Sequence, residues 1–229
     1  MSEASTLTLA GDALIEAFAD IPVAFISDAL DNLRLPNTLI EGIKPLVGRR
    51  LVGRAYTIDR IVLPVNATQA DIDPSLALGV QKAIDAAEPG RIIVLASGGS
   101  DRNSTWGGNM GLRAALLGVA GVVTDGPLRD LDEAEEIGLP VFGKGIDPRR
   151  SIGRLATIAI DVPVILHGVR VRPGDIIVGD RDGVIVVAPE QAQSILESVA
   201  GLRDAEAAIQ ASVRAGVPLV DSIRKFKKF

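Results

Sequence analysis

The middle of the chain repeats one design, in which an apolar strand is followed by a turn and a helix. Arg91–Ala96 is a largely apolar run, and a glycine-rich loop then leads into an Ala- and Leu-rich helix that ends near Leu117. Gly121–Thr124 is a second apolar run, followed by the short acidic helix expected over Arg129–Ile137. Such alternation is typical of parallel strands covered by helices. The chain is therefore predicted to have an α/β fold.

The flanking regions predict the remaining elements. N-terminal helices are expected within about residues 8–35, a strand over Gly53–Leu63, and a C-terminal amphipathic helix over about residues 189–214. After Asp147-Pro148 the periodicity changes to two, which predicts hairpins from the runs Ala156–Ile160, Val162–Leu166, Asp175–Val178 and Val184–Val187. We expect a mixed central sheet flanked by helices, in a single domain spanning residues 1–229.

Composition excludes several classes of function. The chain has no cysteine, which rules out a thiol nucleophile, a cysteine zinc site and a disulfide framework. A net charge of −5 argues against a nucleic-acid partner. No apolar run reaches membrane-spanning length, so we expect no membrane partner and a cytoplasmic protein. The only local run of basic charge is read as a solvated terminus and comprises Arg224, Lys225, Lys227 and Lys228.

The segment Gly107-Gly108-Asn109-Met110 is expected to begin a helix. Backbone N–H groups at the start of a helix are free, and glycines leave them unobstructed, so the segment is a candidate cradle for a carboxylate. A plain turn is the alternative interpretation of the same pattern. In open α/β sheets ligands bind at the carboxyl ends of strands, and this helix follows such an end.

Arg129 and Asp130 follow the next strand end along the chain. An arginine can hold a carboxylate through two hydrogen bonds, and an aspartate supplies a hard oxygen ligand for Mg²⁺ or Mn²⁺. A helix-start aspartate beside a solvated arginine is the structural alternative. If the two loops converge, the pair predicts a site that binds an acid and polarises its carbonyl.

Other candidate residues carry weaker predictions. His167 is interpreted as a turn residue, Asp71 and Asp73 as a loop or cap, and Lys144 as an exposed loop lysine. Trp106 is expected either to line a pocket or to pack in the core. No nucleophile elbow, Walker loop or zincin motif is present.

The chain resembles the RraA-like family, which includes the 4-hydroxy-4-methyl-2-oxoglutarate aldolases. The resemblance rests on the central segments 106–110, 118–130 and 138–142, framed by Ser27-Asp28-Ala29-Leu30, Gly53-Arg54-Ala55, Pro173-Gly174-Asp175 and the segment 179–184. These motifs lie in the family's order over nearly the whole chain. The resemblance implies a swivelling β/β/α-type fold and a homo-oligomer, either a trimer or a pair of trimers, with active sites at subunit interfaces.

The resemblance also implies roles for particular residues. Gly107, Gly108, Asn109 and Met110 would hold the carboxylate of a 2-oxo acid through their amides. Arg129 matches the family's substrate-binding arginine and Asp130 its ligand to a divalent metal ion, Mg²⁺ or Mn²⁺. Glu206 is similar to the glutamate that reaches the metal's water ligands from a neighbouring subunit. The expected activity is that of a lyase, an aldolase or decarboxylase that releases pyruvate from 4-hydroxy-4-methyl-2-oxoglutarate or oxaloacetate.

The sequence departs from the family pattern at two places. Gly108 stands where many members have an acidic residue that handles a proton. The turn before Arg129-Asp130 reads Gly126-Pro127-Leu128, whereas the family more often has a small residue followed by Val-Arg-Asp. Two alternatives therefore stay open. One is a non-catalytic regulator that binds an RNA-processing enzyme, as the RraA branch does. The other is a lyase or hydratase for a sugar-derived oxo acid on the same scaffold.

Overall fold

The computed structural model of the protein describes residues 11–64 and 79–226. These residues form two compact units, one within residues 38–189 and the other combining the segment up to residue 37 with the segment from residue 190 onward. Each unit is described by itself. The predictions for Asp71, Asp73, Lys227 and Lys228 lie outside the described residues.

The larger unit is built on a mixed sheet with the strand order β1-β13-β12-β3-β4-β5-β7-β2, and β9 pairs with β3 beside this path. The four strands from β3 to β7 run parallel, and the other pairs are antiparallel. The predicted mixed sheet is thus confirmed. The strands are β1 (Leu39–Ile40), β2 (Lys44–Val47), β3 (Leu51–Val62), β4 (Arg91–Ala96), β5 (Gly121–Thr124), β7 (Val141–Gly143), β9 (Leu155–Ile160), β12 (Ile176–Gly179) and β13 (Val184–Val187).

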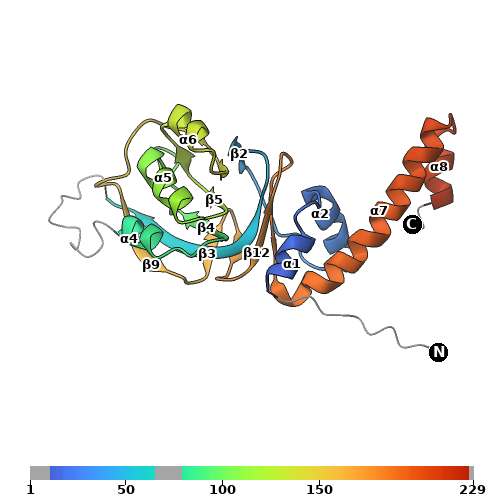
Figure 1. Cartoon of the computed structure of the whole chain (residues 1–229), viewed down its shortest axis with the longest axis horizontal. Coiled ribbons are helices and arrows are strands. Elements are labelled where there is room, and N and C mark those ends of the chain that lie inside the picture. Colours follow the sequence, from blue (N-terminus) through green and yellow to red (C-terminus); the bar gives the residue numbers. More distant parts are fainter. Residues whose placement is uncertain (1–10, 65–78, 227–229) are drawn as a thin grey trace. The chain divides into compact units, whose positions relative to one another are not determined.

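Both faces of this sheet are buried. On one face lie the helices α4 (Gly79–Asp85), α5 (Gly108–Leu116) and α6 (Leu131–Ile137) (Figure 1). Ile93 and Leu95 of β4 belong to the core on this face, whereas Ile92 and Val94 belong to a second core with the hairpin of β10 (Val164–Leu166) and β11 (Val169–Val171). Alternate residues of a strand point to opposite faces, which explains the nearly continuous apolar run. The helical layer expected on at least one face is confirmed.

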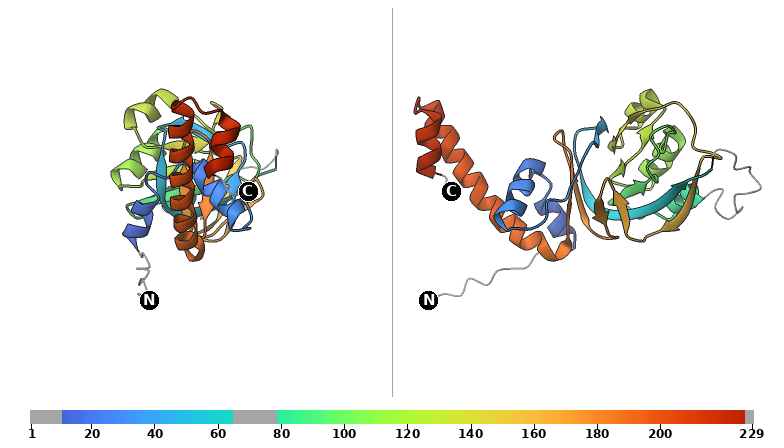
Figure 2. Two further views of the ribbon diagram at one scale, coloured as in Figure 1. Left: turned by 90° about the vertical axis from the view of Figure 1, so that its right-hand side faces the viewer. Right: turned by 180° about the vertical axis from the view of Figure 1, so that it is seen from behind.

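The smaller unit is helical and contains α1 (Asp12–Ala17), α2 (Val23–Asn32), α7 (Ala192–Arg214) and α8 (Leu219–Phe226). Helix α2 begins directly after Pro22, as predicted, because proline lacks the N–H that a first helical turn leaves unused. It packs against α7, and α8 folds back along the end of α7 (Figure 2). None of the described helices has both the length and the apolar character required to cross a membrane.

Several predicted boundaries were wrong. β1, β2 and α8 are elements for which no prediction was made. The run 156–160 does not form a hairpin with its sequence neighbour: it pairs with β3, while β10 pairs with β11. The acidic helix begins at Leu131, after a short strand β6 (Pro127–Leu128) that replaces the expected loop. The pairings of β1 with β13, β2 with β7 and β9 with β3 join segments distant in sequence, which local periodicity does not encode.

Arg60 in β3 is a buried cation and gives a prediction about stability. Its side chain is only 3% exposed, burial lowers its pKa to about 10, and Nε and Nη1 have no hydrogen-bond partner within the described structure. A buried charge without a partner is costly, so Arg60→Met is expected to stabilise the protein by about 1 kcal/mol, or roughly 2–4 °C in Tm. Differential scanning calorimetry measures this, with exposed Arg170→Met as the control. A fall in Tm specific to Arg60→Met would contradict the prediction.

Candidate functional site

Main-chain hydrogen bonds lock three segments together at the carboxyl ends of β4 and β5. They are the loop after β4, the turn after β5 and the segment around residue 149. Parallel pairing of β6 with β8 (Gly145–Ile146) extends the turn after β5. The linking bonds are Thr105 N–H to Pro127 O at 2.8 Å, Arg129 N–H to Trp106 O at 3.1 Å, Asp147 N–H to Leu128 O at 2.9 Å and Ser104 N–H to Arg149 O at 2.8 Å. The two loops that the sequence analysis singled out therefore converge.

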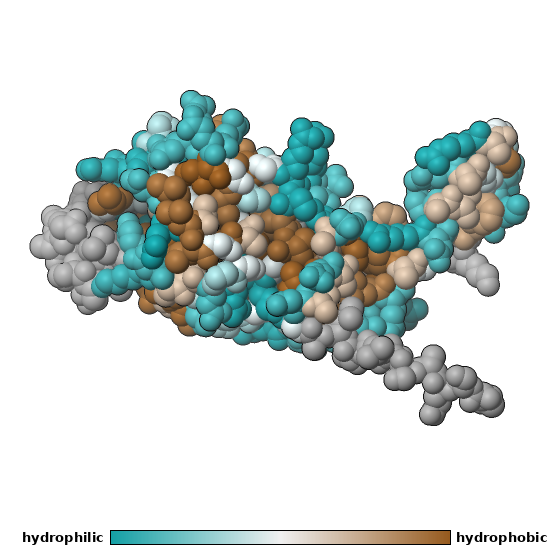
Figure 3. All heavy atoms as spheres, viewed as in Figure 1, coloured by the Kyte–Doolittle hydropathy of each residue, from teal (hydrophilic) through white to brown (hydrophobic). Residues whose placement is uncertain are grey.

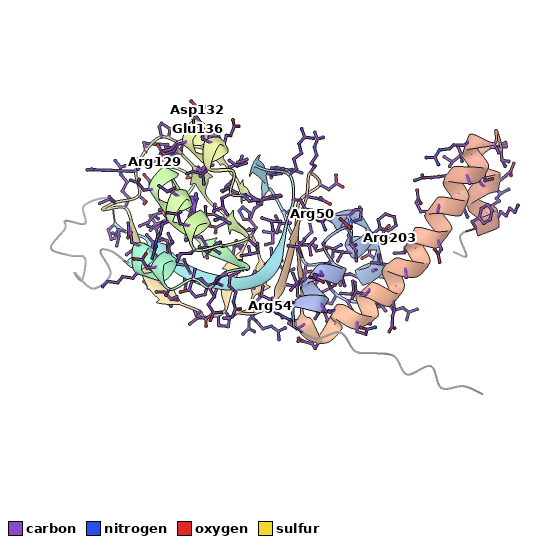
Figure 4. The ribbon with its side chains drawn as sticks, viewed as in Figure 1. Arg50, Arg54, Arg129, Asp132, Glu136 and Arg203 are labelled. Carbon is purple, nitrogen blue, oxygen red and sulfur yellow. The ribbon has the colours of Figure 1, made fainter. Side chains whose placement is uncertain are left out.

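The three segments enclose a cleft of about 210 Å³. This is below the roughly 300–1,000 Å³ of pockets for drug-sized ligands, so the cleft suits a small ligand. It is lined by Gly107, Gly108, Asn109, Met110, Arg129 and Asp130, and also by Trp106, Glu133 and Arg150. Every predicted site residue of the larger unit lies in this one cleft. Figure 4 shows Arg129 beside α5, while Asp132 and Glu136 lie on the outer surface of α6.

Asp130 occupies an unusual backbone conformation at the start of α6. Its φ of 59° and ψ of 46° place it in the left-handed region, which costs a non-glycine residue about 1–2 kcal/mol. In this position its Oδ2 accepts the Gly108 N–H at 3.1 Å and lies 3.4 Å from Arg129 Nε. A strained residue that the surroundings hold in place is a reason to examine a site for function. The strain here turns the carboxylate towards the start of α5.

A side chain at position 107 or 108 would displace the carboxylates of the cleft. A Cβ on Gly107 would lie 2.8 Å from Asp130 Oδ2, and a Cβ on Gly108 would lie 1.9 Å from Glu133 Oε2. The carboxylate of Glu133 therefore occupies the space that a side chain at position 108 would use. The sequence analysis missed Glu133, although a residue three positions after Asp130 on a helix lies on the same face.

The first turn of α5 offers one free amide. The Gly108 N–H donates to Asp130, and the Met110 N–H donates to Gly107 O at 3.1 Å. Among the described residues no acceptor is found for the Asn109 N–H, nor for the terminal nitrogens of Arg129. The guanidinium and this amide can therefore bind one carboxylate between them.

Polar side chains join the ends of β4 and β5. Ser97 donates from its backbone N–H, at 2.6 Å, and from its hydroxyl to Asp125 Oδ1. Burial raises the pKa of the Asp125 carboxyl, and the two Ser97 hydrogen bonds and the charge of His167 oppose that rise. The hydroxyls of Thr105 and Thr124 are 2.9 Å apart, which joins the loop after β4 to the end of β5. These contacts fix the backbone from which the site residues project.

The side chains present fit a hard divalent ion. Asp130 and Glu133 both line the cleft and offer carboxylate oxygens, the donors that Mg²⁺ and Mn²⁺ prefer. Within the described residues no group of three or more His, Asp and Glu side chains comes together. Mg²⁺ usually keeps several water ligands and needs only one or two carboxylates. The Asp130 carboxylate is therefore a sufficient protein ligand for such an ion.

The remaining predicted residues lie elsewhere or play other parts. Trp106 both lines the cleft and packs in the core at 1% exposure. His167 has a φ of 46° at the turn between β10 and β11, and Lys144 is exposed between β7 and β8. Glu206 lies on α7, where it accepts a hydrogen bond from Gln210 at 3.4 Å. Its role towards a neighbouring subunit stays a prediction.

The fold and the cleft define an α/β protein with a polar cleft at the carboxyl ends of its parallel strands. A family model described as RraA-like, Aldolase/RraA, matches residues 23–186. The chain belongs to the RraA-like family.

Relatives and solved structures agree with this assignment. The chain is 35% identical over 187 residues, 80% of each chain, to a Halalkalibacterium halodurans protein named "Putative 4-hydroxy-4-methyl-2-oxoglutarate aldolase". An uncharacterized protein from Pseudomonas syringae has a similar structure, with a TM-score of 0.83, 27% identity and 96% coverage of both chains. Streptomyces coelicolor RraAS2, described as an unusual member of the RNase ES inhibitor RraA family, has a TM-score of 0.72 and 27% identity, covering 86% of this chain and 95% of its own.

Proposed function

We propose that the protein is a divalent-metal-dependent lyase that cleaves a carbon–carbon bond of a small 2-oxo acid to give pyruvate. The observation that carries the proposal is the convergence of Arg129 and Asp130 with the glycine start of α5, joined by the 3.1 Å contact from Gly108 N–H to Asp130 Oδ2. The aldolase name of the Halalkalibacterium relative supports the same activity.

In the proposed mechanism each residue has a defined part. Arg129 and the Asn109 amide bind the carboxylate next to the keto group and orient the acid. Asp130 would hold Mg²⁺ or Mn²⁺, which when bound would act as a Lewis acid and stabilise negative charge on the keto oxygen. When the carbon–carbon bond breaks, its electron pair passes to the pyruvyl fragment as an enolate. Uptake of one proton by that enolate gives pyruvate.

Aldol cleavage and decarboxylation differ in one proton. A 4-hydroxy acid must lose its hydroxyl proton as the bond breaks, whereas oxaloacetate loses carbon dioxide without such a step. Glu133 is the cleft carboxylate that can accept the hydroxyl proton, in place of the acidic residue absent at position 108. Both reactions therefore fit this cleft, and aldol cleavage depends more strongly on Glu133.

Pyruvate release from a panel of 2-oxo acids tests the proposal. The purified protein is assayed with oxaloacetate and 4-hydroxy-4-methyl-2-oxoglutarate, with Mg²⁺ or Mn²⁺ and then with EDTA. We expect pyruvate that disappears with EDTA and returns when metal is added back. Release of pyruvate at the same rate in EDTA would refute metal dependence, and no release from any acid would refute the lyase.

The proposal extends to assembly and to a competing role. We expect a trimer or a pair of trimers, in which Glu206 of the partner subunit reaches the metal's water ligands; light scattering measures the assembly. The likeness to Streptomyces coelicolor RraAS2 supports the alternative of a regulator that binds an RNA-processing enzyme. Co-purification with such an enzyme, together with an inactive pyruvate assay, would favour the regulator.

A further inference from the structure

We propose that Arg150 binds the second carboxylate of a dicarboxylic 2-oxo acid and so determines the specificity of the cleft. The inference rests on the proposed function, because it assigns the far end of the same substrate. Arg150 lines the cleft together with Arg129, although it comes from a different segment.

Two adjacent arginines in this segment differ in their partners. Arg149 is held by Asp147, whose Oδ1 accepts the Arg149 backbone N–H at 2.8 Å and Nε at 2.9 Å. These bonds lower the pKa of Asp147 to about 2, so the carboxylate is ionised and compensates Arg149. Within the described structure no carboxylate lies within ion-pair distance of Arg150. Arg150 is therefore the guanidinium of this pair that can take up an external anion.

The backbone of Arg150 is fixed. The preceding carbonyl, Arg149 O, accepts the Ser104 N–H at 2.8 Å, and Arg150 O accepts Arg154 Nη1 at 2.9 Å. Ser151 O accepts the N–H groups of Arg154 and Leu155, both at 2.9 Å. A guanidinium on a fixed backbone loses less freedom when it binds, which favours its use in recognition. Arg150 is therefore placed against the cleft by the same contacts that join the three segments.

The charges of the cleft favour a dianion. Its charged lining residues are Arg129, Arg150, Asp130 and Glu133, so cations and anions balance. A divalent ion at Asp130 would bring two positive charges, and a dicarboxylate brings two negative ones. With a monocarboxylate, Arg150 would face the cleft without an anion. Arg129 and Arg150 lie on separate segments, which suits an acid that carries a carboxylate at each end.

Binding measurements test this assignment independently of catalysis. Calorimetric titration with Mg²⁺ compares 2-oxoglutarate with 2-oxopentanoate, which lacks the distal carboxylate. We expect wild-type protein to bind 2-oxoglutarate more tightly, and Arg150→Met to lose about 10–100-fold in affinity for it, because a hydrogen-bonded charge contributes about 1.5–3 kcal/mol. Affinity for 2-oxopentanoate is expected to stay unchanged. Arg150→Lys is expected to retain part of the preference, because lysine keeps the charge but lacks the planar guanidinium that binds a carboxylate through two hydrogen bonds.

Arg102→Met removes the same charge from a side chain that is 81% exposed and serves as the control. The assignment is overturned if wild-type protein shows no preference for 2-oxoglutarate, or if Arg150→Met keeps that preference. An inactive pyruvate assay refutes the lyase but leaves this binding preference measurable, so the two failures are distinguishable.

Discussion

Asp130→Asn is expected to lower metal-dependent pyruvate formation by about a thousandfold. The substitution removes the negative charge that would hold the divalent ion, and the ion contributes several kcal/mol to stabilisation of the transition state. A loss of about 4 kcal/mol corresponds to a factor of about 10³ in rate. The asparagine side-chain oxygen can still accept the Gly108 N–H, so Tm is expected to change little. Steady-state kinetics and calorimetry measure the two effects.

Asp132→Asn is the matched control for this experiment. Asp132 lies on α6 as well, is exposed and does not line the cleft, so the same loss of charge occurs outside the site (Figure 4). Equal losses in the two variants would show that general electrostatics, and not metal binding, governs the rate. Full activity of Asp130→Asn with Mg²⁺ would contradict the proposed role of Asp130.

Gly108→Ala is expected to reduce aldol cleavage by about 10²-fold with little loss of stability. The new Cβ would lie 1.9 Å from Glu133 Oε2, so the carboxylate must move. It is the end of a flexible side chain and can rotate away, which spares the fold. Displacing a group that accepts a proton costs about 10²–10⁴-fold in rate. Oxaloacetate decarboxylation needs no such acceptor and is expected to fall much less.

The double variant Gly108→Asp with Glu133→Ala sharpens this test. It moves the carboxylate from α6 to α5 and is expected to recover part of the aldol activity that Glu133→Ala alone loses. Gly201→Ala is the control, because a Cβ there meets nothing within 4 Å. If Glu133→Ala cleaves the hydroxy acid at the wild-type rate, Glu133 is not the proton acceptor.

Local patterns were sufficient to predict the central part of the fold and most of the cleft. Arg91–Ala96 and Gly121–Thr124 form strands as predicted, because an apolar run between turn residues allows few other structures. Gly107 precedes α5 and Asp130 precedes α6, so both lie at helix starts near the predicted positions. Because ligands bind at the carboxyl ends of strands in open α/β sheets, the two helix starts are expected to lie at one site.

The residues that sequence did not predict depend on long-range pairing. Arg150 reaches the cleft because β6 pairs with β8 and the Asp147 N–H donates to Leu128 O. Sequence periodicity predicts neither contact. Glu133 could have been found from its spacing to Asp130, but its proximity to Gly108 depends on how α5 and α6 pack. Helix packing distances are set by the side chains at the contact, which a single sequence does not rank.

The main-chain bonds that join the three segments have a consequence for engineering. They use backbone atoms of residues 104–106, 127–129 and 147–149, so the neighbouring side chains can be exchanged without removing the supports. Randomising positions 150–152 would therefore sample new acids on an unchanged frame. A collection of such variants, selected for growth on different carbon sources, would give enzymes that share one cleft but differ in substrate specificity.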